Sequence, residues 1–288
     1  MTGMDRKPET YRALYQEGIK RLQQAGIEEA SLDARLLLEY VCGTDRNDML
    51  LHADREVQEK EITRYRQMLS QRAAHMPLQY LTNQQEFMGL PFYVDENVLI
   101  PRQETELLVE EIMKDGHDGK RILEIGTGSG CIILSLLHYS NSCQGTATDI
   151  SEGALETAKK NAGRLGLEVE LVRTDLAAGV IATNGKGAYD IIVSNPPYIA
   201  SSVIPTLMPE VRDHEPVTAL DGGEDGLAFY RRILRETKEL LAPGGKYYFE
   251  IGYDQGDAVK TLLEDYGCRD VHIVKDYAGF DRIAYGTR

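Results

Sequence analysis

From about residue 100 onward, short apolar segments alternate with amphipathic helical segments, and this alternation leaves the chain few possible folds. The residues favour strands at 121–125, 146–150, 168–172, 189–194, 246–251, 271–275 and 282–286. They favour helices at 131–139, 151–165, 227–241 and 255–266. Alternating units of this kind form a mostly parallel sheet with helices on both faces. The sequence therefore predicts a doubly wound α/β domain with a mostly parallel seven-stranded sheet.

The N-terminal part of the chain carries a different pattern, which is helical throughout. Apolar residues recur at three- and four-residue spacing over 11–22 and again over 57–69, as on one face of a helix. Between these stripes, Ser31 is a suitable N-cap and Gly43 a suitable C-terminal stop for a helix at 32–41. We therefore expect a small helical bundle before the α/β domain.

The charge of the chain changes close to the point where the helical pattern ends. Residues 1–75 carry a net charge of −1, and residues 76–288 carry −13. Residues 76–98 lack helical spacing and are interrupted by turn-forming residues, which favours a small β-hairpin. We therefore expect a helical bundle at 1–75, a hairpin linker at 76–98 and the α/β domain at 99–288.

The overall charge excludes several classes of function. The chain has 32 Lys and Arg and 46 Asp and Glu, so its net charge is −14. This is the wrong sign for a general binder of nucleic acid or of an anionic membrane surface. No apolar run approaches the ~18 residues of a membrane span. Residues 1–8 contain no apolar core that could serve as a secretory signal. We expect a cytoplasmic protein that binds neither membranes nor nucleic acid directly.

The cysteines and histidines show no spacing typical of a metal site. Cys42, Cys131, Cys143 and Cys268 are scattered without a Cys-x-x-Cys pair, and the six histidines are equally dispersed. Such a pattern is typical of reduced thiols in a cytosolic protein. We expect neither a disulfide nor a metal site.

A glycine-rich loop joins the first strand of the α/β domain to its helix. It reads Glu-Ile-Gly-Thr-Gly-Ser-Gly over Glu124–Gly130. Glycine permits a tight turn and lets a ligand approach the main chain closely. Asp149 ends the next strand, about twenty residues on, where a carboxylate can accept hydrogen bonds from ribose hydroxyls. Asp175 follows the third strand, where it can approach an adenine amino group.

The spacing of the glycines separates two nucleoside cofactors. A dinucleotide loop has the form G-x-G-x-x-G, because a pyrophosphate sits on the helix N-terminus. Here the spacing is G-x-G-x-G, the next position is Cys131, and the acidic Glu124 stands at the loop entrance. This form resembles motif I of S-adenosylmethionine-dependent methyltransferases, whose cofactor carries ammonium and sulfonium charges and no phosphate. We therefore favour S-adenosylmethionine over NAD.

A second motif, Asn-Pro-Pro-Tyr, follows the fourth strand at Asn195–Tyr198. Open α/β sheets bind ligands at this end of their strands. Two prolines fix the backbone and remove two N–H donors, which leaves nearby carbonyl groups as acceptors. The Asn195 side-chain oxygen and the Pro196 carbonyl can each accept one N–H of a planar –NH2 group, and so orient its nitrogen toward a methyl donor. The motif is typical of methyltransferases that act on adenine, guanine or glutamine amino groups, and alone it does not choose among them.

Four further segments narrow the choice. They are Ile100–Glu106, Val211–Pro216, Gly222–Tyr230 and Glu250–Gly256. Together with the two motifs, the helical N-terminus and the hairpin, they resemble the peptide chain release factor glutamine N5-methyltransferase family over essentially the whole chain. The resemblance implies a Rossmann-like class I methyltransferase domain. It also implies methylation of the glutamine in the Gly-Gly-Gln motif of bacterial class I release factors, a protein modification that modulates translation termination.

The resemblance also implies roles for individual residues. Residues expected to line the S-adenosylmethionine site are Arg102, Glu104, Glu124, Gly126, Thr127, Gly128, Ser129, Gly130, Asp149, Ile150, Asp175, Leu176 and Asn195. Residues expected to hold the glutamine and to act in catalysis are Asn195, Pro196, Pro197 and Tyr198. The helical bundle is expected to dock the release factor, and the protein to act as a monomer. Two departures from the family pattern stand out: Glu124 replaces a frequent Asp, and Leu176 replaces the Trp of some relatives.

Three other functions compete with this one. A glutamine methyltransferase of a ribosomal protein would share the motifs, so the N-terminal unit would have to distinguish it. A nucleic-acid adenine or guanine amino methyltransferase would use the same Asn-Pro-Pro-Tyr motif, and the −13 charge of residues 76–288 argues against it. A binding module without catalysis on the same scaffold would not need both motifs intact.

Overall fold

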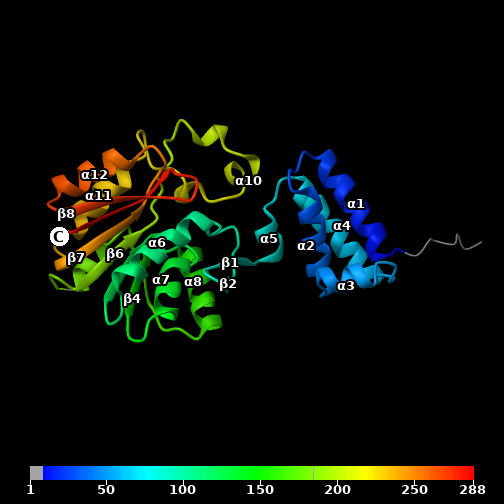
Figure 1. Cartoon of the computed structure of the whole chain (residues 1–288), viewed down its shortest axis with the longest axis horizontal. Coiled ribbons are helices and arrows are strands. Elements are labelled where there is room, and N and C mark those ends of the chain that lie inside the picture. The colour runs from blue at the N-terminus through cyan, green and yellow to red at the C-terminus, as the bar shows by residue number, and fades with distance from the viewer. Residues whose placement is uncertain (1–8, 184) are drawn as a thin grey trace, which may run out of the picture. The chain divides into compact units, whose positions relative to one another are not determined.

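The computed structural model describes residues 9–183 and 185–288. These residues form two compact units (Figure 1). Of the described residues, one unit comprises those up to Asn83 together with Pro209–His214, and the other comprises those from Gln84 to Met208 together with Glu215–Arg288. Residues 1–8, which bear on the expectation about a secretory signal, lie outside the described part of the chain. Within that part, no helix is long and apolar enough to cross a membrane.

The first unit is built of helices around one apolar core. Its helices are α1 (Tyr11–Gln24), α2 (Ala30–Cys42), α3 (Arg46–Leu51), α4 (Glu59–Ala73), α5 (Leu78–Thr82) and α10 (Pro209–Arg212). The apolar stripes of α1, α2 and α4 meet in the core, which includes Leu14, Leu37 and Leu69. Tyr65 crosses the core and donates a hydrogen bond of 3.1 Å to the Ala34 carbonyl.

Helix α2 begins earlier than the sequence predicts. Ser31 is not its N-cap, because the helix begins at Ala30 after Glu29. Ala30 and Ala34 are both buried in the core. Their packing therefore extends the helix toward the N-terminus, beyond Ser31. The predicted end is confirmed: Gly43 has a φ of 61°, the left-handed conformation that stops a helix.

Helix α10 belongs to the helical unit although its residues follow the Asn-Pro-Pro-Tyr motif in sequence. The Glu210 carboxylate accepts a hydrogen bond of 3.1 Å from Arg72 and lies 2.9 Å from the ring Nδ1 of His75. Arg72 also donates a 2.7 Å bond to Asp33, and both side chains are buried. The carboxylates of Asp33 and Glu210 thus share one buried guanidinium within this unit.

The second unit holds a seven-stranded sheet. Its strands are β3 (Arg121–Ile125), β4 (Gln144–Asp149), β5 (Glu170–Arg173), β6 (Tyr189–Ser194), β7 (Leu241–Glu250), β8 (Arg269–Lys275) and β9 (Asp281–Thr287). They lie in the order β5-β4-β3-β6-β7-β9-β8, and all neighbours are parallel except the two pairs that involve β9. The predicted fold class, an α/β Rossmann-like domain with a mostly parallel seven-stranded sheet, is confirmed.

Helices cover both faces of this sheet (Figure 1). One face carries α6 (Gln103–Asp115), α7 (Cys131–His138) and α8 (Glu152–Leu165), together with the hairpin of β1 (Gln85–Phe87) and β2 (Leu90–Phe92). The other face carries α9 (Ala178–Thr183), α11 (Ala228–Thr237) and α12 (Gly256–Asp265). Two short 3₁₀ turns, Ile204–Thr206 and Val217–Ala219, lie in the loops. Alternate strand residues such as Ile122 and Leu123 enter opposite cores.

Strand β7 is longer than the sequence predicts, and helix α11 is shorter. The helix ends at Thr237, and the strand begins at Leu241 rather than at Lys246. Leu241 is buried and pairs with Tyr189, and the register then shifts before Lys246 pairs with Ile191. The Pro-Gly-Gly segment therefore forms an irregularity inside a strand rather than a helix stop.

The strand order creates the place where a ligand can bind. Connections run outward from β3 to β4 and β5 on one side, and β6 lies on the other side of β3. In open α/β sheets such a switch point opens a crevice at the carboxyl ends of the strands. The glycine loop follows β3, and the Asn-Pro-Pro-Tyr motif follows β6.

Candidate functional site

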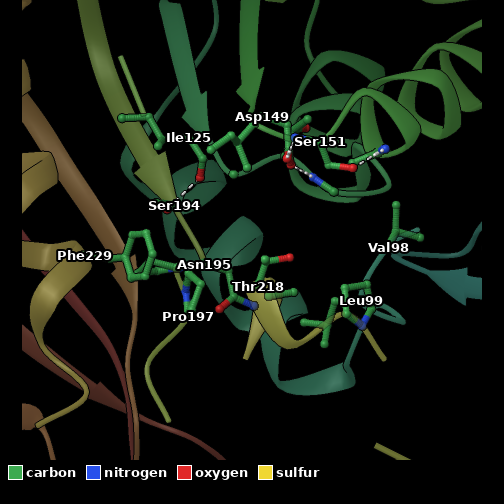
Figure 2. A pocket seen from close by; sticks show the side chains of 18 of the residues that line it. Val98, Leu99, Ile125, Asp149, Ser151, Ser194, Asn195, Pro197, Thr218 and Phe229 are labelled. Atoms are coloured by element: carbon green, nitrogen blue, oxygen red, sulfur yellow. Dashed lines mark hydrogen bonds between the residues drawn. The ribbon is translucent and has the colours of Figure 1, made fainter. Parts of the chain in front are cut away.

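A cavity of about 550 Å³ lies at the carboxyl ends of β3, β4 and β6. It is lined by the glycine loop, by the residues after β4 and by the start of the Asn-Pro-Pro-Tyr motif. Figure 2 shows Asp149, the last residue of β4, and Asn195, which directly follows β6, on different walls of this cavity. The hydroxyl of Ser194 donates a hydrogen bond of 2.7 Å to the Ile125 carbonyl and so joins the ends of β6 and β3.

The glycine loop takes a backbone conformation that side chains disfavour. Gly126, Gly128 and Gly130 have φ angles of 73°, 55° and 80°, all in the left-handed region. The N–H groups of Gly126 and Thr127 both donate to the Thr148 carbonyl, which attaches the loop to β4. A Cβ on Gly126 or Gly128 would meet nothing within 4 Å, so the requirement there is conformational.

Glu124 places a fully buried carboxyl group at the entrance of this loop. The Thr127 hydroxyl donates a hydrogen bond of 2.5 Å to its Oε2. Burial raises the pKa of Glu124 to about 8, although the Thr127 hydrogen bond opposes the shift. A cation bound beside this group would recover the ionised form, because an opposite charge favours the carboxylate.

Asp149 is held in position by two backbone N–H groups. Its Oδ2 accepts a bond of 2.9 Å from Gly128, and its Oδ1 accepts one of 2.9 Å from Ser151. A carboxylate has about four acceptor positions, so both oxygens can still accept from a diol. The next side chain, Ile150, is apolar yet 59% exposed and lines the cavity. An exposed aliphatic side chain beside a fixed carboxylate suits a nucleoside.

Asp175 lies at another part of the cavity lining. It forms an ion pair of 2.8 Å with Arg232. Leu176 has a φ of 49°, uncommon for a residue with a side chain, and it is nearly buried in the core beneath the cavity.

Arg102 connects two segments that are far apart in sequence. Its Nη2 lies 2.7 Å from both carboxylate oxygens of Glu215, which is 1% exposed at its side chain. Burial raises the pKa of Glu215, and the Arg102 charge opposes that shift. Because Arg102 lines the cavity, this pair holds one of its edges.

The backbone of the Asn-Pro-Pro-Tyr motif is packed closely from behind. A Cβ on Gly222 would lie 2.8 Å from both the Pro197 carbonyl oxygen and the Tyr198 Cα. The Gln255 side chain donates a bond of 3.0 Å to the Tyr198 carbonyl. The loop glycine and the buried amide together fix the path of the motif.

A chain of hydrogen bonds connects Asn195 to a buried carboxylate. The Asn195 Nδ2 donates to the Thr105 hydroxyl at 3.3 Å, and that hydroxyl donates to Glu250 Oε2 at 2.6 Å. The Tyr198 hydroxyl donates to the other oxygen of Glu250 at 3.2 Å. Burial raises the pKa of Tyr198 well above its usual range.

The structure brings most of the sequence-predicted site residues to the cavity. Those that line it are Arg102, Glu124, Gly126, Thr127, Gly128, Ser129, Asp149, Ile150, Asp175, Leu176, Asn195, Pro196 and Pro197. Glu104, Gly130 and Tyr198 are not among the described residues that line it. Glu104 is exposed on α6, Gly130 precedes α7, and Tyr198 turns toward Glu250.

Among the residues that hydrogen bonds join to the Asn-Pro-Pro-Tyr motif, three received no role from the sequence. They are Thr105, Glu250 and Gln255, which lie in segments that resemble the family motifs. The available signal was a glutamate placed directly after the apolar run Tyr247–Phe249, where a strand enters the core.

The residues present fit S-adenosylmethionine. The described cavity lining contains carboxyl groups at Glu124, Asp149 and Asp175, which suit cationic and hydroxyl groups of a ligand. The cationic residues of that lining, Arg102 and Arg232, are each paired with a carboxylate rather than directed at the glycine loop. The negative charge of a pyrophosphate would find few positive partners here. The positive charges of an ammonium and a sulfonium would find carboxylate partners. Among the described residues, no group of three His, Cys, Asp or Glu side chains is placed to hold a metal ion.

Comparison with known proteins decides the family. The release factor glutamine methyltransferase of Caulobacter vibrioides is 40% identical over 272 residues, which cover 93% of this chain and 93% of that protein. The enzyme of the same name from Moorella thermoacetica is 43% identical over 278 residues, covering 95% and 96%. This chain belongs to the release factor glutamine methyltransferase family.

Two family models match separate parts of this family member. The PrmC N-terminal domain model matches residues 13–82, and the methyltransferase small domain model matches residues 102–209. The crystal structure of a methyltransferase from Pyrococcus furiosus superposes with a TM-score of 0.53 at 22% identity, covering 70% of this chain and 90% of that one, which supports the fold. The predicted family is confirmed, and S-adenosylmethionine is the cofactor of its methyltransferase domain.

Proposed function

We propose that this protein transfers a methyl group from S-adenosylmethionine to the side-chain amide nitrogen (N5) of the glutamine in the Gly-Gly-Gln motif of bacterial class I release factors, and so modulates translation termination. One observation carries the proposal. Asn195, Pro196 and Pro197 line the same cavity as the glycine loop, in a chain 40% identical to a release factor glutamine methyltransferase.

In this proposal, different residues of the cavity bind different parts of S-adenosylmethionine. Glu124 lies toward the cationic end of the donor, Asp149 toward its ribose and Asp175 toward its adenine. The glycine loop allows close approach of the main chain, while Arg102 closes the edge of the site. When bound, S-adenosylmethionine supplies an electrophilic methyl group and yields S-adenosylhomocysteine.

The residues on the acceptor side of the cavity orient the amide of the substrate glutamine. The Asn195 Oδ1 and the Pro196 carbonyl each accept one N–H of the glutamine amide, which directs the nitrogen lone pair toward the methyl group. Pro197 and Tyr198 hold the backbone that presents these acceptors. Alignment of two reactants contributes more here than a strong base, because the amide proton can leave after transfer.

The two units divide the work. We assign recognition of the release factor to the helical unit, which includes α5 and Pro209–His214, linkage to the hairpin of β1 and β2, and catalysis to the unit that holds the seven-stranded sheet. The protein acts as a monomer in the cytoplasm and does not bind nucleic acid directly. The acidic charge of 76–288 favours a protein substrate over RNA or DNA.

The test is methylation of purified substrates with labelled S-adenosylmethionine, followed by mass spectrometry that maps the methyl group. We expect label on the glutamine of the Gly-Gly-Gln motif in release factor. We also expect Asn195→Ala to abolish transfer while calorimetry still detects donor binding. Label that appears instead on ribosomal protein, RNA or DNA would replace the proposed substrate.

A further inference from the structure

A buried carboxylate lies behind the acceptor motif, outside the cavity lining. Glu250 is the last residue of β7 and is 1% exposed. Its Oε2 accepts from Thr105 at 2.6 Å, and its Oε1 accepts from Tyr198 at 3.2 Å. The Tyr230 hydroxyl donates to its backbone carbonyl at 2.8 Å, which fixes the strand end. Burying a carboxylate so completely lowers the stability of the fold unless the carboxylate accepts hydrogen bonds.

Burial raises the pKa of Glu250, and the Thr105 hydrogen bond, the Arg282 charge and the Tyr198 hydrogen bond oppose that shift. With Glu250 ionised, counting protons along this chain fixes the direction of every bond. A threonine hydroxyl has one proton to donate and can accept as well. The Thr105 proton goes to Glu250, so the same oxygen must accept from Asn195, at 3.3 Å. Only the Nδ2 group of Asn195 can be that donor. The Asn195 Oδ1 is therefore left free of Thr105 and available as an acceptor.

We propose that Glu250 and Thr105 are positioning residues that hold the Asn195 side-chain amide in the one orientation able to accept an N–H from the substrate amide. The inference rests on the proposed role of Asn195 toward glutamine. Were the Asn195 amide turned over, its NH2 group would face the NH2 group of the substrate. Two donors cannot form a hydrogen bond, so the acceptor nitrogen would lose its orientation.

The same bonds explain why a carboxylate suits this buried position. An ionised Glu250 accepts at both oxygens, once from Thr105 and once from Tyr198. A glutamine at this position has one acceptor oxygen and one NH2 group. Whichever of the Thr105 and Tyr198 hydroxyls met this NH2 group would have to accept a hydrogen bond instead of donating one. Such a change at Thr105 would turn the Asn195 amide over.

Thr105→Val tests the connection with the smallest change, because it replaces the hydroxyl by a methyl of similar size. We expect the kcat for release factor methylation to fall about tenfold to hundredfold, as for other losses of alignment. The dissociation constant of S-adenosylmethionine, measured by calorimetry, should change less than about threefold, since Thr105 does not hold the donor in this proposal. Thr105→Ser restores the hydroxyl and should recover most of the lost kcat. Glu250→Leu removes both acceptor oxygens and should lower kcat as Thr105→Val does, whereas Glu250→Gln keeps one acceptor oxygen for Thr105 and should lower kcat less.

A matched control separates positioning from general loss of packing. Thr237 is also fully buried, and its hydroxyl bonds Ile233 and Tyr247 within the α11 side of the core. Thr237→Val should lower the melting temperature without a comparable loss of kcat. A Thr105→Val enzyme that keeps its kcat, or a Thr105→Ser enzyme as slow as Thr105→Val, would overturn the positioning role. A wild-type enzyme that fails to methylate release factor would instead overturn the proposed function.

Discussion

The hydroxyl of Ser194 donates a 2.7 Å hydrogen bond to the carbonyl oxygen of Ile125, and both residues are buried. Ser194 ends β6 and Ile125 ends β3, so the bond joins the two strand ends from which the acceptor motif and the glycine loop begin. The distance between the donor and acceptor halves of the cavity is therefore set by the sheet itself, before any ligand arrives.

Ser194→Ala removes this bond and should lower the free energy of unfolding by about 1 kcal/mol, as for an ordinary buried hydrogen bond. Ser135 provides the matched control. It is also fully buried, and its hydroxyl has no hydrogen-bond partner among the described residues. Ser135→Ala should be neutral or stabilising. Urea unfolding of the three proteins measures both effects, and equal losses for the two serines would contradict the role of the Ile125 bond.

Gly222→Ala should push the Asn-Pro-Pro-Tyr backbone toward the cavity. The added Cβ would lie 2.8 Å from the Pro197 carbonyl oxygen, closer than such atoms approach in proteins. We expect kcat to fall at least about tenfold, because misplacement of reacting groups is costly, while donor binding persists. Gly163 lies in α8 with open space around the Cβ position, so Gly163→Ala should stabilise the protein by up to about 1 kcal/mol and leave kcat unchanged. Steady-state kinetics and thermal unfolding of both variants distinguish the two effects.

Glu124 should make stability depend on pH. Burial raises its pKa to about 8 in the folded protein, from an ordinary 4.5. Between these values the unfolded chain has lost the proton and the folded protein keeps it, so this contribution to stability falls as pH rises from 4.5 to 8. Glu124→Gln should flatten that part of the profile. A variant whose unfolding free energy follows the wild-type profile over this range would show that Glu124 is ionised in the fold.

The same group should couple donor binding to proton release. Below pH 8 the Glu124 carboxyl is protonated in the donor-free protein, and a cationic ligand favours its ionised form. The affinity for S-adenosylmethionine should therefore rise with pH up to about 8 and then level off. Calorimetry in buffers of different ionisation enthalpy would detect the released proton. Glu124→Gln should bind more weakly and release none.

Arg102→Met leaves the Glu215 carboxylate buried without its cation. The loss should destabilise the protein by about 1–3 kcal/mol, the usual cost of a buried acceptor left unpaired. Because Arg102 lines the cavity, donor affinity should fall as well. The double variant Arg102→Met/Glu215→Leu should regain stability, since apolar residues often replace a buried pair without loss. It should not regain donor affinity, and recovery of both would mean that the pair serves the fold alone.

Local signals in the sequence predicted much of this structure. Periodicity located the seven strands. The residues Glu124–Ser129 of the glycine loop and Asn195–Pro197 line one cavity. The capping expectation failed at Ser31, because burial of Ala30 and Ala34 outweighs a hydrogen bond at a helix end. The early start of β7 at Leu241 was not predicted for a related reason: the pairing of Leu241 with Tyr189 is a contact between residues distant in sequence.

The polar network behind Asn195 could not be predicted at all. Thr105 belongs to α6, Glu250 to β7 and Tyr198 to the loop after β6. A hydroxyl and a carboxylate separated by 145 positions have no periodicity in common. Only the assembled sheet, with β7 beside β6, shows that these polar groups meet.

The helical unit is completed by residues from the middle of the catalytic sequence, and this limits how the protein can be divided or recombined. A fragment that ends at Asn83 would lack Glu210, the partner of Arg72 and His75, and would expose the surface that Pro209–His214 covers. A fragment that starts at Gln84 would carry that insertion with nothing to pack against. An exchange of helical units between relatives would therefore have to replace the residues up to Asn83 and Pro209–His214 together. Substitutions on α4 and at 209–212 should occur together in relatives.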